Sequence, residues 1–100
     1  MQLAAPTLDP QLELPDLEAA ARKLATRARA LINHAACDDQ ENALGVAAFS
    51  FDSAAHLIDR GETDAARDAL RAACSYASCE DANAPQLAEA ARTLLAALPA

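Results

Sequence analysis

The sequence has few of the residues that build β-sheets, and only two glycines. Its 100 residues include one valine, two isoleucines, three aromatic residues and no tryptophan. β-Branched and aromatic side chains are the ones that strands favour, so a sheet would lack its usual components. Two glycines are too few for the glycine-rich loops that cradle phosphates. The composition predicts an all-α protein.

Cysteines and basic residues are also scarce. Three cysteines, an odd number with no CxxC pair, do not make a disulfide framework, which favours a reducing compartment. The chain opens with no charged and then apolar leader, so we expect a cytoplasmic location. Eight basic residues against fifteen acidic ones give a net charge of −7. Phosphate contacts require a positive surface, so a nucleic-acid partner is not expected.

Alanine and leucine dominate what is present, with 29 and 14 copies. Alanine has the highest helix propensity but buries little area. At roughly 25 cal/mol per Å² of buried apolar surface, a core of this kind is only modestly stable by itself. Self-association or binding to another protein chain is therefore expected.

The pattern predicts two regions, an arm over 1–15 and a helical bundle domain over 16–100. Three of the five prolines lie in the arm, which either packs on its own domain, exchanges with a second copy or becomes ordered on a partner. The first helix is expected over 16–36, and the second from an Asp38 capping box to a stop at Gly61. The third should begin at residue 62 or 63. The fourth should begin after an N-cap at Asn83, with Pro85 in its first turn. Short loops between four helices predict a small up-down antiparallel bundle. The first helix should bury a heptad of leucines, and the fourth an apolar stripe: Leu17, Leu24, Leu31; Leu87, Ala91, Leu94, Leu98.

Half of the basic residues lie in one eight-residue stretch of the first predicted helix, residues 22–29. Glu18 and Arg22 are four residues apart, the spacing of an exposed ion pair. A run of this kind is typically a solvated face. The alternative is a contact surface for an acidic partner or a second copy of this acidic chain, with Arg22 and Arg29 as candidate partner-binding residues.

The most apolar segment is ALGVAAFSFDSAAHLI, residues 43–58. A membrane helix needs about 20 uninterrupted apolar residues, and Asp52 interrupts this shorter run, so no membrane span is predicted. Its apolar residues instead cover more than one helix face, which predicts a central helix flanked by the first helix and by the third or fourth. One face should be buried: Leu44, Ala47, Ala48, Phe51, Ala55, Ile58.

Phe49 is left over when that face is buried. With Ser53 and His56 it is a candidate partner-binding anchor, unless the leucine-bearing arm covers it. Gly45 costs about 1 kcal/mol relative to alanine inside a helix, which suggests a closely crossing backbone, although chance explains it equally well.

Two groups of residues are candidates for chemistry. His34 and Cys37, with nearby acids, should lie at the same end of the bundle as Cys79, but the paired short spacings of zinc sites are missing, so no metal is expected. Asp52, Ser53 and His56 have the parts of a nucleophilic site without an oxyanion hole. We expect His56 to be hydrogen-bonded to Asp52, and we expect neither catalysis nor a cofactor.

The segment from Ala54 to Ala73 resembles half of a tetratricopeptide unit. Ala54 lies in its first helix, Gly61-Glu62-Thr63-Asp64 forms the turn, and small or apolar residues recur in the second helix at Ala66, Leu70 and Ala73. The pattern departs at Ser50, where an aromatic residue belongs, and near Cys79, where proline closes the unit. The resemblance covers about a third of the chain and implies a helical-hairpin protein.

The function that these patterns favour is a non-enzymatic helical protein–protein interaction module. An adaptor, a chaperone or a small inhibitor of another protein fits equally well, and a homodimer is expected. The competing hypothesis is a domain that binds a small apolar ligand between its alanine-rich helices.

Overall fold

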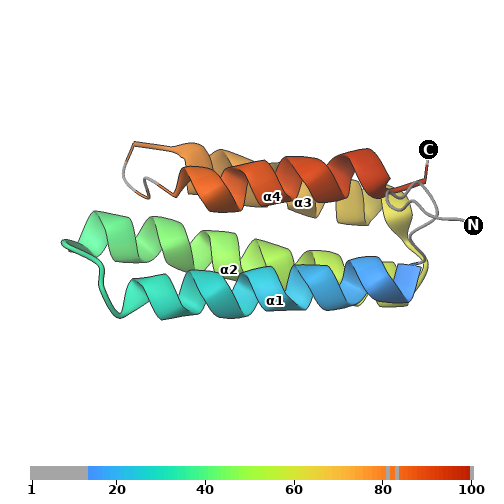
Figure 1. Ribbon diagram of the computed structural model, residues 1–100, viewed down its shortest axis with the longest axis horizontal. Helices are drawn as coiled ribbons and strands as arrows, with labels where there is room; N and C mark the ends of the chain where they lie inside the picture. Colours follow the sequence, from blue (N-terminus) through green and yellow to red (C-terminus); the bar gives the residue numbers. More distant parts are fainter. Residues whose placement is uncertain (1–13, 81, 83, 100) are drawn as a thin grey trace, which may run out of the picture.

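Four α-helices make up the described part of the chain, which is residues 14–80, 82 and 84–99 of the computed structural model. They are α1 (Leu14–Ile32), α2 (Asp38–Asp59), α3 (Thr63–Ser78) and α4 (Pro85–Ala97). They run up and down along one long axis, joined by short loops (Figure 1). The all-α antiparallel bundle predicted from composition and periodicity is confirmed. The predicted N-terminal arm falls on residues that lie outside the described ones, apart from its last two.

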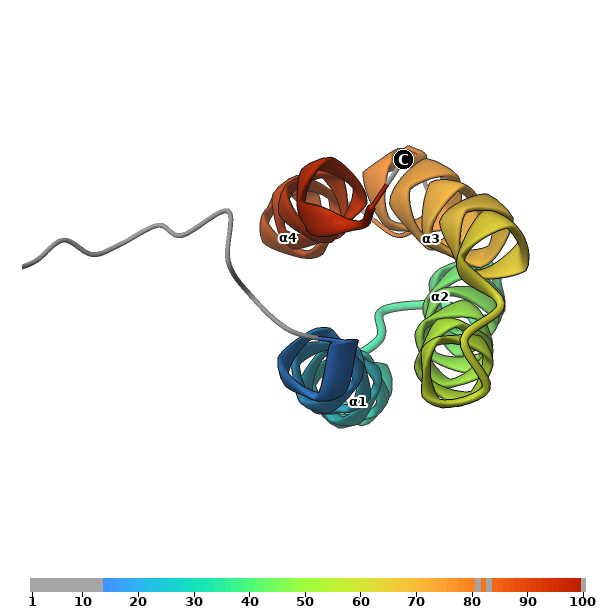
Figure 2. The ribbon, with the colours of Figure 1, turned by 90° about the vertical axis from the view of Figure 1, so that its right-hand side faces the viewer.

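The helices pack in sequential order, each against the next. α2 lies between α1 and α3, and α4 packs on α3 (Figure 2). Contact between α1 and α4, which would close the ring of four, is the weakest of the neighbouring pairs. The prediction of a central second helix flanked by the first and third is therefore confirmed. The bundle is least tightly closed along its α1–α4 side.

The predicted helix breaks at Gly61 and Pro85 are confirmed, but two predicted caps are wrong. Gly61 adopts φ +78° directly after Arg60, the C-cap of α2, and Pro85 occupies the first turn of α4. Cys37 stands at the N-cap of α2 and Ala84 at that of α4, neither with a side-chain capping hydrogen bond. Asp38 therefore lies inside the helix, where its charge faces the positive end of the macrodipole instead of capping the backbone.

The first helix is shorter at its C-terminus than predicted. The sequence predicts a helix to residue 36, but α1 ends at Ile32, where the next turn has tighter bonds from the His34 N–H to the Leu31 carbonyl and from the Ala35 N–H to the Ile32 carbonyl. Such i−3 bonds satisfy terminal carbonyls and end an α-helix. Leu17 and Leu24 of the predicted heptad are buried, but Leu31, next to the last residue of α1, is 39% exposed.

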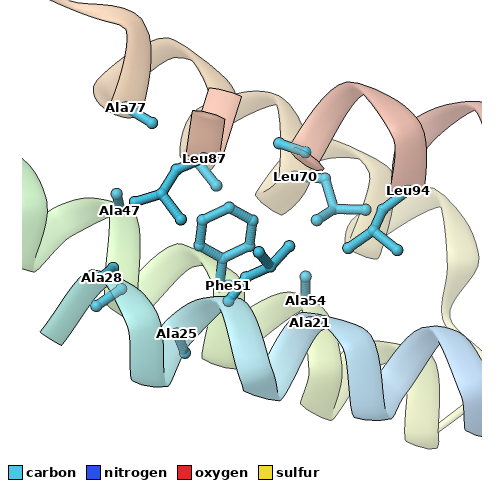
Figure 3. Packing of buried hydrophobic residues seen from close by; sticks show 14 of the residues in the cluster. Ala21, Ala25, Ala28, Ala47, Phe51, Ala54, Leu70, Ala77, Leu87 and Leu94 are labelled. Carbon is cyan, nitrogen blue, oxygen red and sulfur yellow. The ribbon is translucent and has the colours of Figure 1, made fainter. Parts of the chain in front are cut away.

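Phe51 lies at the centre of the core. Its ring lies between alanines of α1 and leucines of α3 and α4, with Leu70, Leu87 and Leu94 on the far side from α1 (Figure 3). Alanines at the contact let α1 and α2 approach closely, leaving room for one large side chain. The predicted buried faces of the second and fourth helices are confirmed in full: Leu44, Ala47, Ala48, Phe51, Ala55, Ile58; Leu87, Ala91, Leu94, Leu98.

Candidate functional site

Phe49 is the most exposed large apolar side chain among the described residues. It is 71% exposed, whereas Phe51 of the same helix is 0% exposed. At about 100° per residue these positions are about 200° apart, so Phe49 lies opposite the core. The described residues, α1 and α3 included, leave this side chain open to solvent.

Ser53 and His56 follow Phe49 by four and seven residues, so the three share one side of α2. His56 is exposed and Ser53 is half-buried. Val46, three residues before Phe49, is also an exposed apolar residue. We call the set Gly45, Val46, Phe49, Ser53 and His56 the α2 outer face. The three α2 residues predicted to bind a partner are thus brought together on this face.

The two candidate arginines lie elsewhere and are occupied by carboxylates of the chain. Arg22 forms the predicted ion pair with Glu18, with Nη2 and Oε2 2.8 Å apart. Arg29 of α1 instead pairs with Asp52 of α2, a contact across 23 residues that the sequence did not predict. Both guanidinium groups are therefore paired with carboxylates of α1 and α2, and the structure does not gather them with Phe49.

The predicted hydrogen bond between His56 and Asp52 is wrong. The Asp52 carboxylate accepts from Arg29, and in the described part of the chain no hydrogen bond joins it to His56. The His56 side chain is exposed. Asp52 points toward the α1 side of the helix, which explains why the guanidinium, and not the imidazole, is its partner.

The suggestion that Gly45 accommodates a closely crossing backbone is also wrong within this chain. A β-carbon built at Gly45 would have no neighbouring atom within 4 Å. Gly45 belongs to the α2 outer face, so no element of the bundle requires its small size.

His34, Cys37 and Cys79, the residues weighed as metal ligands from the sequence, lie at one end of the bundle. Over residues 14–80, 82 and 84–99, no three His, Cys, Asp or Glu side chains are close enough to hold an ion. All three cysteines are free thiols, and Cys37 is exposed. Cys74 is half-buried and accepts a hydrogen bond from Arg92 at 3.7 Å.

A hollow at the same end of the bundle was not predicted. It has a volume of about 370 Å³. Leu31, Leu44 and Leu87 form its apolar side, and Arg27 of α1 and His34 of the following turn also line it. The pocket lies where α1 ends at Ile32, and Leu31 in its lining is 39% exposed. The position of that helix end is the feature that sequence periodicity placed four residues too late.

Neither a membrane-spanning helix nor a related protein was found for the described chain. In the described ranges, none of the helices combines the length and apolar content needed to cross a membrane. Comparison with protein-family models, with curated proteins and with solved structures found no match for this chain. The α2–α3 hairpin has its turn at Gly61, as in the tetratricopeptide resemblance, but that resemblance stays a prediction.

Proposed function

We propose that this protein is a non-enzymatic helical interaction module that self-associates through the α2 outer face. The observation that carries the proposal is the 71% exposure of Phe49 on the helix that also supplies the central core residue. Aromatic side chains are enriched in the buried centres of protein interfaces, where they act as anchors. A second copy of the chain that covered Phe49 would remove its apolar surface from water.

The charge of this face supports a second copy as the partner. Its five residues carry no formal charge when His56 is neutral, whereas the chain as a whole carries −7. Two copies of an acidic protein repel one another over most approaches, and a neutral patch is where that repulsion is least. Asp52, the nearest acid on α2, is neutralised by Arg29.

The position of Phe49 along α2 fits a twofold contact. The helix has 22 residues, and Phe49 adjoins its midpoint. Two α2 helices that cross at their midpoints about a twofold axis would bring each Phe49 beside the other copy's α2 outer face. Symmetric dimers are the commonest protein assemblies. The open space around Gly45 would then be available to the second copy's backbone.

Sedimentation equilibrium of three proteins tests this proposal. The wild type should approach twice its 10.4 kDa mass as concentration rises, and Phe49→Ser should stay monomeric with an unchanged helical circular dichroism spectrum. Leu31→Ser, a matched loss of an exposed apolar side chain away from this face, should associate like the wild type. A monomeric wild type, or a Phe49→Ser variant that still associates, would overturn the proposal.

The hollow beside Leu31 supports a second candidate function, the binding of a small apolar ligand. Its volume is about 370 Å³, and most of its lining is apolar. Pockets of that size and character are typical of small-molecule sites. We propose a saturable, equimolar binding of an apolar anionic dye such as anilinonaphthalene sulfonate at this pocket. Gln86→Trp, at the exposed rim, should block it, whereas Gln11→Trp in the arm should not. Dye binding that Gln86→Trp leaves intact would exclude this site.

A further inference from the structure

A second surface of the bundle, separate from the α2 outer face, lies along the weakly packed side between α1 and α4. We call it the α1–α4 groove. It has a volume of about 310 Å³, with Leu24 and Leu94 as its floor and Ala20 and Ala90 along its walls. Figure 2 shows α1 and α4 facing each other across this side of the bundle. Ala20 and Ala90 have side chains too small to fill the seam beside Leu24 and Leu94.

The rim of this groove is positively charged, which is unusual in an acidic protein. Lys23 and Arg27 of α1 line it together with Thr93 of α4. Five of the eight basic residues form ion pairs, but within the described ranges neither Lys23 nor Arg27 has a carboxylate partner. An occupant that suits this groove is therefore apolar and acidic.

The first thirteen residues of the chain have that chemistry. MQLAAPTLDPQLE contains three leucines and two acids and no lysine or arginine. Pro6 and Pro10 disfavour a helix and favour an extended backbone, which can lay alternate side chains along a groove. In an extended backbone Leu8 and Leu12 lie on one side and Asp9 and Glu13 on the other, so apolar and acidic side chains are separated.

The segment also begins in the right place. It joins α1 at Leu14, at the end of the bundle where α4 finishes (Figure 1). Leu24 is ten residues along α1 and therefore about 15 Å from Leu14. Thirteen extended residues span about 40 Å, so the segment reaches the whole groove. A smaller hollow near Pro15 is lined by Glu18, Asp59 and Arg60, so its charge is mixed and it lacks the basic rim of the groove.

We propose that residues 1–13 bind in the α1–α4 groove of their own chain, with their leucines on Leu24 and Leu94 and Asp9 beside Lys23 and Arg27. The groove is thus an intramolecular docking site for the N-terminal segment. This docking completes the fourth side of the bundle and does not depend on the α2 outer face.

Paramagnetic relaxation in the full-length chain tests the proposal. A nitroxide is attached at Thr7→Cys after Cys37, Cys74 and Cys79 are replaced by serine. Amide signals of Ala90, Thr93 and Leu94 should broaden, and those of Phe49 and His56 should not. Broadening at Phe49, or at no site in the bundle, would overturn the proposal. So would broadening carried from a labelled chain to an isotopically distinct one, since that result means exchange of the segment between copies.

Charge-reversal variants test whether the docking depends on the basic rim. Lys23→Glu with Arg27→Glu should abolish the broadening, while Arg60→Glu with Arg71→Glu, the same change of charge away from the groove, should leave it. Reversing the segment instead, with Asp9→Lys and Glu13→Lys, leaves every bundle residue intact and should also abolish it. Combining the groove and segment reversals should restore it. Broadening that persists through both reversals would overturn the role of charge in the docking.

Discussion

Phe49 and Phe51 are two residues apart on α2 and have opposite environments. Phe51 is fully buried among residues of all four helices, and Phe49 is 71% exposed on the other side of the same helix. Helical geometry separates them by about 200°, so the bundle uses one ring and leaves the other in solvent. Phe51 therefore stabilises the folded chain, and Phe49 is the residue on which the proposed contact with a second copy depends.

Truncation of the two rings should therefore have very different effects. Phe51→Ala should lower the free energy of unfolding by about 3–5 kcal/mol, because it removes the central ring and leaves a cavity. Phe49→Ala should change it by less than about 0.5 kcal/mol at concentrations where the chain is monomeric. Urea unfolding followed by circular dichroism measures both, and Phe51→Leu serves as a variant that keeps the fold. Equal losses for Phe49→Ala and Phe51→Ala would contradict the assignment.

The two glycines should respond to alanine with opposite signs. Gly61 has φ +78° and follows Arg60, the C-cap of α2. A left-handed conformation costs an L-residue about 1–2 kcal/mol, so Gly61→Ala should destabilise the protein. Gly45 is helical with no atom within 4 Å of an added β-carbon. Gly45→Ala should therefore stabilise the monomer by up to about 1 kcal/mol. Thermal unfolding of dilute samples measures the difference, and a loss of stability in Gly45→Ala would show that its space is already occupied.

The ion pair between Arg29 and Asp52 should contribute little to stability. Its side chains are 52% and 37% exposed. Water and salt therefore screen the attraction. A double-mutant cycle with Arg29→Ala and Asp52→Ala should give a coupling of about 0–1 kcal/mol that falls in concentrated salt. The cycle on Arg22 and Glu18, whose side chains are 51% and 23% exposed, is the comparison. A coupling several times larger than that range would mean that this pair is far better shielded than its exposure indicates.

The three thiols should react at different rates. Cys37 is exposed at the start of α2, whereas Cys74 and Cys79 are half-buried. An aromatic disulfide reagent should therefore modify one thiol rapidly and two slowly, and Cys37→Ser should remove the fast phase. All three should react at one rate in concentrated guanidinium. A fast phase that persists in Cys37→Ser would contradict the exposures.

The helices of this fold could be predicted because their sequence signals are local. Gly61 and Pro85 mark helix ends through their own backbone chemistry, and the buried face of α2 follows from its 3.6-residue period. The end of α1 was misplaced because residues 33–36 do not include a strong breaker, and their tighter turn is visible only in the hydrogen bonds.

The candidate site was predicted only where it depends on the period of a single helix. Exposure of Phe49 follows from burial of Phe51, since one helix face cannot hold both. The partner of Asp52 is 23 residues away on α1, so it depended on how the helices pack and not on the i, i+4 neighbour His56. The hollow beside Leu31 and the α1–α4 groove likewise arise between helices, where no single segment carries their pattern.

The most direct test of the proposed self-association is the dependence of the amide NMR spectrum on the concentration of the unmodified protein. Residues in the interface change environment as dimers form, while the rest of the bundle does not. The proposal predicts shifts that grow with concentration at Gly45, Val46, Phe49, Ser53 and His56, with the α1–α4 groove unaffected. A spectrum that does not change with concentration, or shifts centred on Lys23 and Thr93, would contradict it.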